Sequence, residues 1–234
     1  MKCKCTYIKE IMTLEVISLE MYNLAPIAPG AHILPPLPYP YNALEPIIDA
    51  RTMEIHHNDL HKSIVEGLNK TELALVEVRK QGNYDFIKFW ENQLAFLGSG
   101  HILHSVFWTN MTSPGTGGSP GEYLTNQINQ YFGNFSAFKA QFLAATKNVE
   151  GSGWGILGYN PAFKHLEILQ CEKFQNLTQW GIIPILVCDV WEHAYFLKYF
   201  ASLDEYVDAW WNLINWSDVK QRLIYAIDAK IPLM

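Results

Sequence analysis

The sequence predicts an α+β protein: an N-terminal antiparallel hairpin of two long helices, then a C-terminal α/β domain with a small, three-stranded antiparallel sheet. Three observations support this fold class. Two long helical patterns follow one another in the first half of the chain. Residues 110–121, rich in glycine, proline and serine, form the clearest linker. Strand-like apolar runs follow that linker, and a helical half followed by a mixed half is typical of an α+β chain.

We divide the 234 residues into an N-terminal extension (1–35), a helical hairpin domain (36–112) and a C-terminal α/β domain (113–234). The extension ends in a proline-rich stretch, and proline cannot continue a helix. Glu10 and Glu15 interrupt the apolar core that a signal peptide would need, so we expect a cytoplasmic protein. The four cysteines are too few and too unevenly spaced for a disulfide framework.

The composition argues against two classes of partner. The net charge is -6, and the sequence has no basic stripe that would bind nucleic acid. No apolar run approaches the length of a membrane span. Aromatic residues make up 14% of the chain, so we expect an aromatic-rich interior, or such an interior together with a subunit interface.

The individual elements follow from hydrophobic spacing and from capping residues. Residues 52–68 and 84–108 carry apolar side chains three and four positions apart, and a modest connection between them predicts the hairpin. Asn134 caps a later helix, and amphipathic helices from Asp204 and Ser217 close the chain. The remaining elements are helices at 123–132 and 135–146 and strands at 154–159, 165–171 and 182–188.

Asp189 and His193 form the first candidate metal pair. Asp189 follows a buried apolar run and His193 comes four residues later, so both side chains converge just outside the edge of the sheet. A carboxylate and an imidazole suit a first-row metal. An aspartate that caps a helix, beside a histidine packed in the core, would give the same pattern. These two residues alone therefore leave both interpretations open.

His56 and His104 complete the candidate site. They lie on the two helices of the hairpin, where facing positions place both imidazoles in one gap. Three neutral imidazoles, one carboxylate and a solvent molecule suit one iron or manganese ion per chain that cycles between the +2 and +3 states. This mononuclear ion would lie between the hairpin and the C-terminal domain.

From about residue 37 to about residue 223, the chain resembles the iron/manganese superoxide dismutase family. The resemblance implies conversion of superoxide to dioxygen and hydrogen peroxide by metal redox cycling, with the same four residues as the metal ligands. The matching segments are Leu37–Pro46, Met53–His57, His104–Trp108, Gly151–Gly155, Asp189–Tyr195 and Trp211–Trp216.

Further roles rest on this resemblance alone. Trp108, Trp154 and Trp191 would form an aromatic wall around the metal. Glu192 would hydrogen-bond a ligand histidine of the partner subunit and orient it, which implies a homodimer. We therefore add Trp154 and Glu192 to the expected site.

Polar positions of the family have become apolar in this chain. Leu60 and Ile64 stand four and eight residues after His56, where a gateway histidine and a channel tyrosine are common, and Phe196 replaces a tyrosine. Because positions 56, 60 and 64 share one face of an α-helix, we expect the channel side of this helix to be apolar.

The hydrogen-bond donor to metal-bound solvent is also missing. The family places a glutamine or histidine at the position of Phe174, or a glutamine at the position of Gly100. Gln175 could replace this donor if its strand carried a one-residue bulge, so it joins the expected site. We expect the remaining histidines in packing or at the surface: His57, His61, His101 and His165.

Three functions remain open at this point. The first is a superoxide dismutase weakened by these changes, because losing one outer partner of a metal site commonly costs about ten- to a hundred-fold. The second is a metalloenzyme on the same fold that uses dioxygen to oxidise an unidentified apolar molecule. The third is a non-catalytic homologue that keeps the metal for stability.

Overall fold

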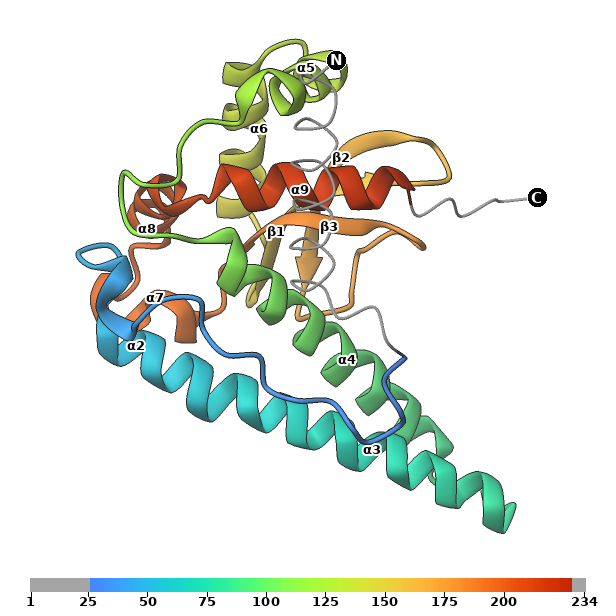
Figure 1. Cartoon of the computed structure of the whole chain (residues 1–234). Coiled ribbons are helices and arrows are strands. Elements are labelled where there is room, and N and C mark those ends of the chain that lie inside the picture. The colour runs from blue at the N-terminus through green and yellow to red at the C-terminus, as the bar shows by residue number, and fades with distance from the viewer. Residues whose placement is uncertain (1–25, 229–234) are drawn as a thin grey trace, which may run out of the picture.

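The N-terminal half is an antiparallel pair of long helices (Figure 1). The computed structural model describes residues 26–228, so residues 1–25 of the expected extension lie outside the described residues. The first long helix is continuous but has three parts: α2 (Ala50–Ile55), a π-helical turn η2 (His56–His61) and α3 (Lys62–Gln81). The second long helix is α4 (Ile87–Asn110).

Local signals set the course of this hairpin. The Asp49 carboxylate caps α2 by accepting a backbone hydrogen bond from its first turn. Gly82 ends α3 in the left-handed conformation, with φ at 66°, which glycine adopts without a steric penalty. The segment 26–40 then lies along the hairpin (Figure 1). The Asn69 amide holds it by hydrogen bonds to both the N–H and the C=O of His32.

The C-terminal half is built on an antiparallel sheet with the strand order β2-β1-β3. Its strands are β1 (Gly153–Asn160), β2 (His165–Glu172) and β3 (Ile183–Asp189). The central strand β1 is buried at every position. The helices of the C-terminal half are α5 (Gly121–Phe132), α6 (Phe135–Lys147), α7 (Glu192–Tyr199), α8 (Leu203–Trp210) and α9 (Trp216–Asp228).

Close packing ties the helices to this sheet. Helix α6 crosses β1 so closely that a Cβ at Gly155 would overlap the Thr146 hydroxyl, which makes glycine necessary there. Helices α4 and α9 both pack against β3. The sheet is therefore covered by helices from both halves of the chain, and β3 lies next to the hairpin (Figure 1).

The Asn110 amide joins the hairpin to the sheet. This side chain is fully buried at the end of α4. Its Oδ1 accepts a hydrogen bond from Val187 N at 2.9 Å, and its Nδ2 donates to Ile185 O at 3.1 Å. The same Nδ2 donates to Asp218 Oδ2 of α9 at 2.7 Å. One amide thus satisfies the free edge of β3 and fixes the position of α4 against it.

The predicted fold class is confirmed: a helical hairpin precedes an α/β domain with three antiparallel strands. The π-helical turn in the first long helix was not predicted. It adds one residue to a single turn, so side chains align at a spacing of five instead of four. No helix within residues 26–228 is both long enough and apolar enough to cross a membrane.

Candidate metal centre

Four ligand atoms converge between the hairpin and the sheet. His56 begins the π-helical turn, His104 lies within α4, Asp189 is the last residue of β3, and His193 lies in the first turn of α7. One ligand atom from each lies within 4.8 Å of the others. The three histidine Nε2 atoms lie 3.2, 3.9 and 3.3 Å from Asp189 Oδ2. Ligand types and spacing of this kind suit a single first-row metal ion.

The hydrogen bonds around the candidate ligands leave the Nε2 atoms of His56 and His104 free, whereas His193 Nε2 lies within hydrogen-bond distance of Asp189 Oδ2, at 3.3 Å. The His104 Nδ1–H donates to Gly100 O at 2.7 Å, so the lone pair of this ring is on Nε2. The Nε2 atoms of His56 and His104 are buried and have no hydrogen-bond partner. Asp189 Oδ1 accepts from Trp191 N at 2.9 Å, which turns Oδ2 inward. Buried polar atoms without a partner cost about 1–3 kcal/mol each, and a bound metal would remove that cost.

The electrostatics favour neutral imidazoles beside an ionised carboxylate. Burial and the neighbouring His193 lower the pKa of His56 to about 4. Burial and the neighbouring His56 lower the pKa of His104 to about 3. Burial alone would raise the pKa of Asp189, but the neighbouring His193 and His56 hold it below its usual value. At neutral pH both buried rings and the carboxylate are thus in the forms that bind metals.

Three tryptophans lie against the ligand rings. Trp154 is fully buried, and its Nε1–H has no hydrogen-bond partner. Trp191 stacks on both His193 and Phe174 and donates its Nε1–H to Lys173 O. The ring centroids lie 4.9 Å apart for His56 and Trp108, 5.2 Å for His104 and Trp154, and 5.5 Å for His193 and Trp191.

Three apolar positions meet beside the ligands and form what we call the apolar lid: Phe174, Ile64 and Gly100. The Phe174 ring lies 5.5 Å from the His104 ring and 6.3 Å from the Trp154 ring, between centroids. A Cβ on Gly100 would lie 3.2 Å from Phe174 and 3.3 Å from Ile64. The glutamine and tyrosine positions that changed in this chain are therefore neighbours in space.

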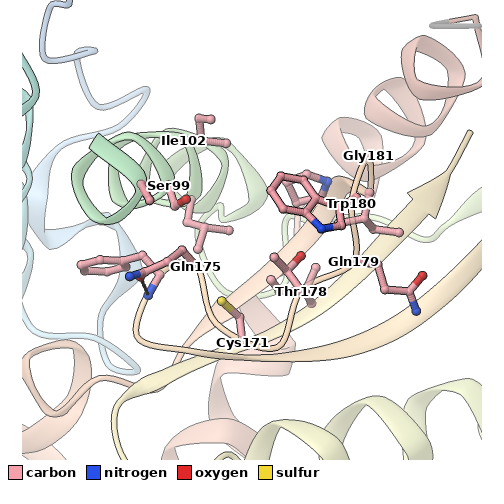
Figure 2. Close-up of a pocket in the computed structure, with 14 residues that line it drawn as sticks. Ser99, Ile102, Cys171, Gln175, Thr178, Gln179, Trp180 and Gly181 are labelled. Atoms are coloured by element: carbon pink, nitrogen blue, oxygen red, sulfur yellow. Dashed lines mark hydrogen bonds between the residues drawn. The ribbon is translucent and has the colours of Figure 1, made fainter. Parts of the chain in front are cut away.

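Gln175 lies outside the ligand cluster. Its Oε1 accepts a hydrogen bond from Phe174 N at 3.3 Å. Its side chain lines a cavity of about 530 Å³ between α4 and the connection from β2 to β3, beside Ser99 and Cys171 (Figure 2). The pairing of β1 with β2 has no bulge that would shift the residue after the strand. The structure thus places Phe174, and not Gln175, against His104.

The π-helical turn changes which side chain follows His56 on the buried face. Leu60, four residues on, is half-buried, whereas His61, five residues on, is fully buried. Ile64 is buried, as an apolar channel side requires. The expectation of a regular helical face at positions 56, 60 and 64 was wrong, because the inserted residue shifts the helical phase. The i+4 spacing of the sequence gave no signal for this shift.

Glu192 and Phe196 lie on the outer side of α7. Glu192 is exposed, and its Oε2 accepts a hydrogen bond from Ser152 Oγ at 2.7 Å. Phe196 is also exposed, one turn beyond the candidate ligand His193. Neither side chain has a polar contact with the four candidate ligands among the described residues, so any role there needs a second chain.

The fold and the cluster together indicate a class: metalloproteins with a mononuclear site between a helical hairpin and a small α/β domain, each of which here supplies two of the four candidate ligands. Family models agree with this class. The model of the α-hairpin domain of iron/manganese superoxide dismutases matches residues 31–112, and that of their C-terminal domain matches residues 120–222.

Curated relatives cover most of the chain. A protein of Bacillus subtilis (strain 168), named "Probable superoxide dismutase [Fe]", is 49% identical over 82% of this chain and 68% of the relative. The "Superoxide dismutase [Mn/Fe]" of Aeropyrum pernix is 46% identical over 86% of this chain and 94% of the relative. The "Superoxide dismutase [Fe]" of Pyrobaculum aerophilum is 46% identical over 86% and 96%, respectively. The chain belongs to the iron/manganese superoxide dismutase family.

Proposed function

We propose that this chain is a superoxide dismutase that holds one iron or manganese ion at His56, His104, Asp189 and His193. The observation that carries the proposal is the convergence of three histidine Nε2 atoms on Asp189 Oδ2. The names of the relatives at 46–49% identity support the same activity. They give no support to the oxidation of an apolar substrate.

The balanced reaction takes two superoxide ions and two protons to one dioxygen and one hydrogen peroxide. The bound metal would supply the one-electron exchange, accepting an electron from the first superoxide and returning it to the second. The protein holds the neutral imidazoles of His56 and His104 in place, and the Asp189 carboxylate would offset part of the metal charge. Trp154 and Phe174 keep bulk water away from His104.

We further propose that the apolar lid weakens this activity. Neither of the two residues considered for the missing glutamine supplies a donor there, because Phe174 fills its position and Gln175 faces another cavity. The Trp154 Nε1–H, which lies among the same rings, remains without an acceptor. Each outer partner lost from a metal site lowers activity or affinity by about ten- to a hundred-fold.

Assembly and location are also proposals. Exposed apolar side chains on α7, next to His193 and Glu192, support a homodimer that would bury this face. The free thiols of Cys171 and Cys188 are compatible with the cytoplasm. We keep residues 1–35, 36–112 and 113–234 as the extension, hairpin domain and C-terminal domain.

The test combines metal analysis with a dismutase assay on the protein purified from cells grown with iron or with manganese. We expect about one metal ion per chain and a dismutase rate that scales with occupancy. Asp189→Asn should abolish both, whereas Asp208→Asn, at the surface, should change neither. Full metal occupancy without any superoxide-dependent turnover would refute the proposed activity.

A further inference from the structure

His61, expected in packing or at the surface, lies inside the candidate metal centre. It is fully buried, and its ring stacks on that of His104 with centroids 5.0 Å apart and planes 21° apart. Its Nδ1 accepts a hydrogen bond from Trp108 Nε1 at 2.9 Å. Its Nε2 lies 2.9 Å from Nδ1 of His101. We propose that His61 is a positioning residue, which fixes the rings of His104 and Trp108 and is itself held by His101.

The hydrogen bonds determine which nitrogen of each ring carries the proton. An indole N–H can only donate, so His61 Nδ1 must be the unprotonated acceptor. The proton of the neutral His61 ring is then on Nε2 and is donated to His101 Nδ1. The chain of donors thus runs in one direction, from Trp108 through His61 to His101. His101 is half-buried and lines a cavity of about 770 Å³ between α4, α9 and the segment 26–40.

The hydrogen-bonded row of Trp108, His61 and His101 supports both candidate ligands that the hairpin supplies. His61 stacks directly on His104, and Trp108 lies edge-on against the His56 ring at 4.9 Å between centroids. A rotation of either support would change the direction of an Nε2 lone pair. Partners beyond the ligands tune metal affinity and geometry in this way in other metal sites. The inference therefore deepens the proposed metal site and rests on it.

The π-helical turn makes this arrangement possible. In a regular α-helix, the residue on the face of His56 would be Leu60, which can neither accept from Trp108 nor donate to His101. The extra residue brings His61 to that face instead. Single π-helical turns inside α-helices are frequent at functional sites.

The first experiment replaces His61 and measures metal binding directly. His61→Phe keeps an aromatic ring against His104 but removes the acceptor for Trp108 and the donor to His101. We expect metal affinity, from competition with a chelator, to fall at least about tenfold. We also expect the electron paramagnetic resonance spectrum of the ferric protein to shift. Leu68→Ala is the matched control: Leu68 is buried on α3 but has no ring or polar contact with a ligand, so it should lower stability without a spectral shift.

The second experiment acts on His101, which does not contact a ligand and is half-buried. His101→Leu removes the acceptor for His61 Nε2–H, whereas His101→Gln keeps an acceptor oxygen. We expect His101→Leu to shift the spectrum in the same direction as His61→Phe, and His101→Gln to restore it largely to wild type. This pair decides the matter even if His61→Phe does not fold.

The outcomes separate this inference from the proposed function. A wild-type spectrum and affinity in both His61→Phe and His101→Leu would overturn the inference while leaving the metal site intact. An equal shift in Leu68→Ala would also overturn it, since any loss of stability would then suffice. Failure of the wild-type protein to bind iron or manganese would instead refute the proposed function.

Discussion

Phe174 shows how one residue can change a metal site without touching its ligand set. Its ring stacks on Trp191 at 4.7 Å and approaches His104, in the position where the family resemblance implied a polar donor. The four candidate ligands remain, but their immediate surroundings are apolar on this side. We therefore expect Phe174 to affect the supply of protons and the redox potential of a bound metal, and not metal binding itself.

Phe174→Gln should restore part of the dismutase activity that we propose the apolar lid removes. The new amide can accept from the unpartnered Trp154 Nε1–H and present its own N–H groups toward the metal position. We expect the dismutase rate per bound metal to rise about tenfold, the lower end of such effects. The measurement is turnover at known metal content. Phe96→Gln is the control, because Phe96 packs on the Phe174 ring and does not contact His104.

Some site residues could be predicted from the sequence and others could not. The four candidate ligands stand in segments of defined order and spacing, and the structure brings them together. The contacts of His61 with His104 and Trp108 were not predicted, because they depend on a π-helical turn, which leaves no i+4 signal. The position of Gln175 depended on whether a bulge exists, and only the register of β1 and β2 answers that question.

Among the elements, α4 and β3 carry two of the candidate ligands and are joined by Asn110. The lengths and types of both elements were predicted from apolar spacing, and the structure confirms them. Their mutual placement could not be predicted, since it depends on an amide that reaches across the domain boundary. Such tertiary hydrogen bonds have no local sequence pattern.

Asn110→Ala should destabilise the whole protein. The change leaves Val187 N–H and Ile185 C=O without their partner on the free edge of β3 and removes a donor from Asp218. We expect the free energy of unfolding to fall by roughly 2–4 kcal/mol, as for buried groups that lose their hydrogen bonds. Urea denaturation of the metal-free protein would measure it. The exposed Asn212→Ala should change stability by less than about 0.5 kcal/mol.

At the scale of the whole molecule, buried histidines link stability to pH. Burial, with neighbouring charges, lowers the pKa of His56 to about 4, of His104 to about 3 and of His101 to about 4. Burial likewise lowers the pKa of His61 to about 2. In the unfolded chain these rings protonate near pH 6.5. Below that pH the unfolded chain therefore binds more protons than the folded one.

The metal-free protein should lose stability as the pH falls from about 6.5 to about 4. Several rings contribute, so the slope of the unfolding free energy against pH should correspond to more than one proton. Denaturation series at half-unit pH intervals would measure it. His61→Phe should lower the slope, because one titrating ring is gone. A flat profile over this range would contradict the prediction.

We base a prediction about assembly on exposed apolar side chains of α7 and of Phe200, which directly follows it. Phe196, Leu197 and Phe200 are 50%, 56% and 67% exposed, respectively. Leu197→Glu would place a charge in the proposed dimer contact, and we expect the protein to sediment as a monomer. Phe163→Glu, at a residue exposed to a similar 57% in the turn between β1 and β2, should leave the dimer intact. A wild-type protein that sediments as a monomer would refute the dimer.

The π-helical turn has one more consequence, because the first long helix packs against two different helices. Upstream of it, α2 packs against α7; downstream, α3 packs against α4. In a regular α-helix without the π-helical turn, the buried faces of the two parts could not both be oriented optimally toward these neighbours. The additional residue in the π-helical turn rotates α2 relative to α3 about the helix axis, so each part can direct its apolar side chains toward its own neighbour. Deleting a single residue of the π-helical turn would hardly change the composition. It would, however, rotate α2 relative to α3 and turn one of them away from the helix on which it packs.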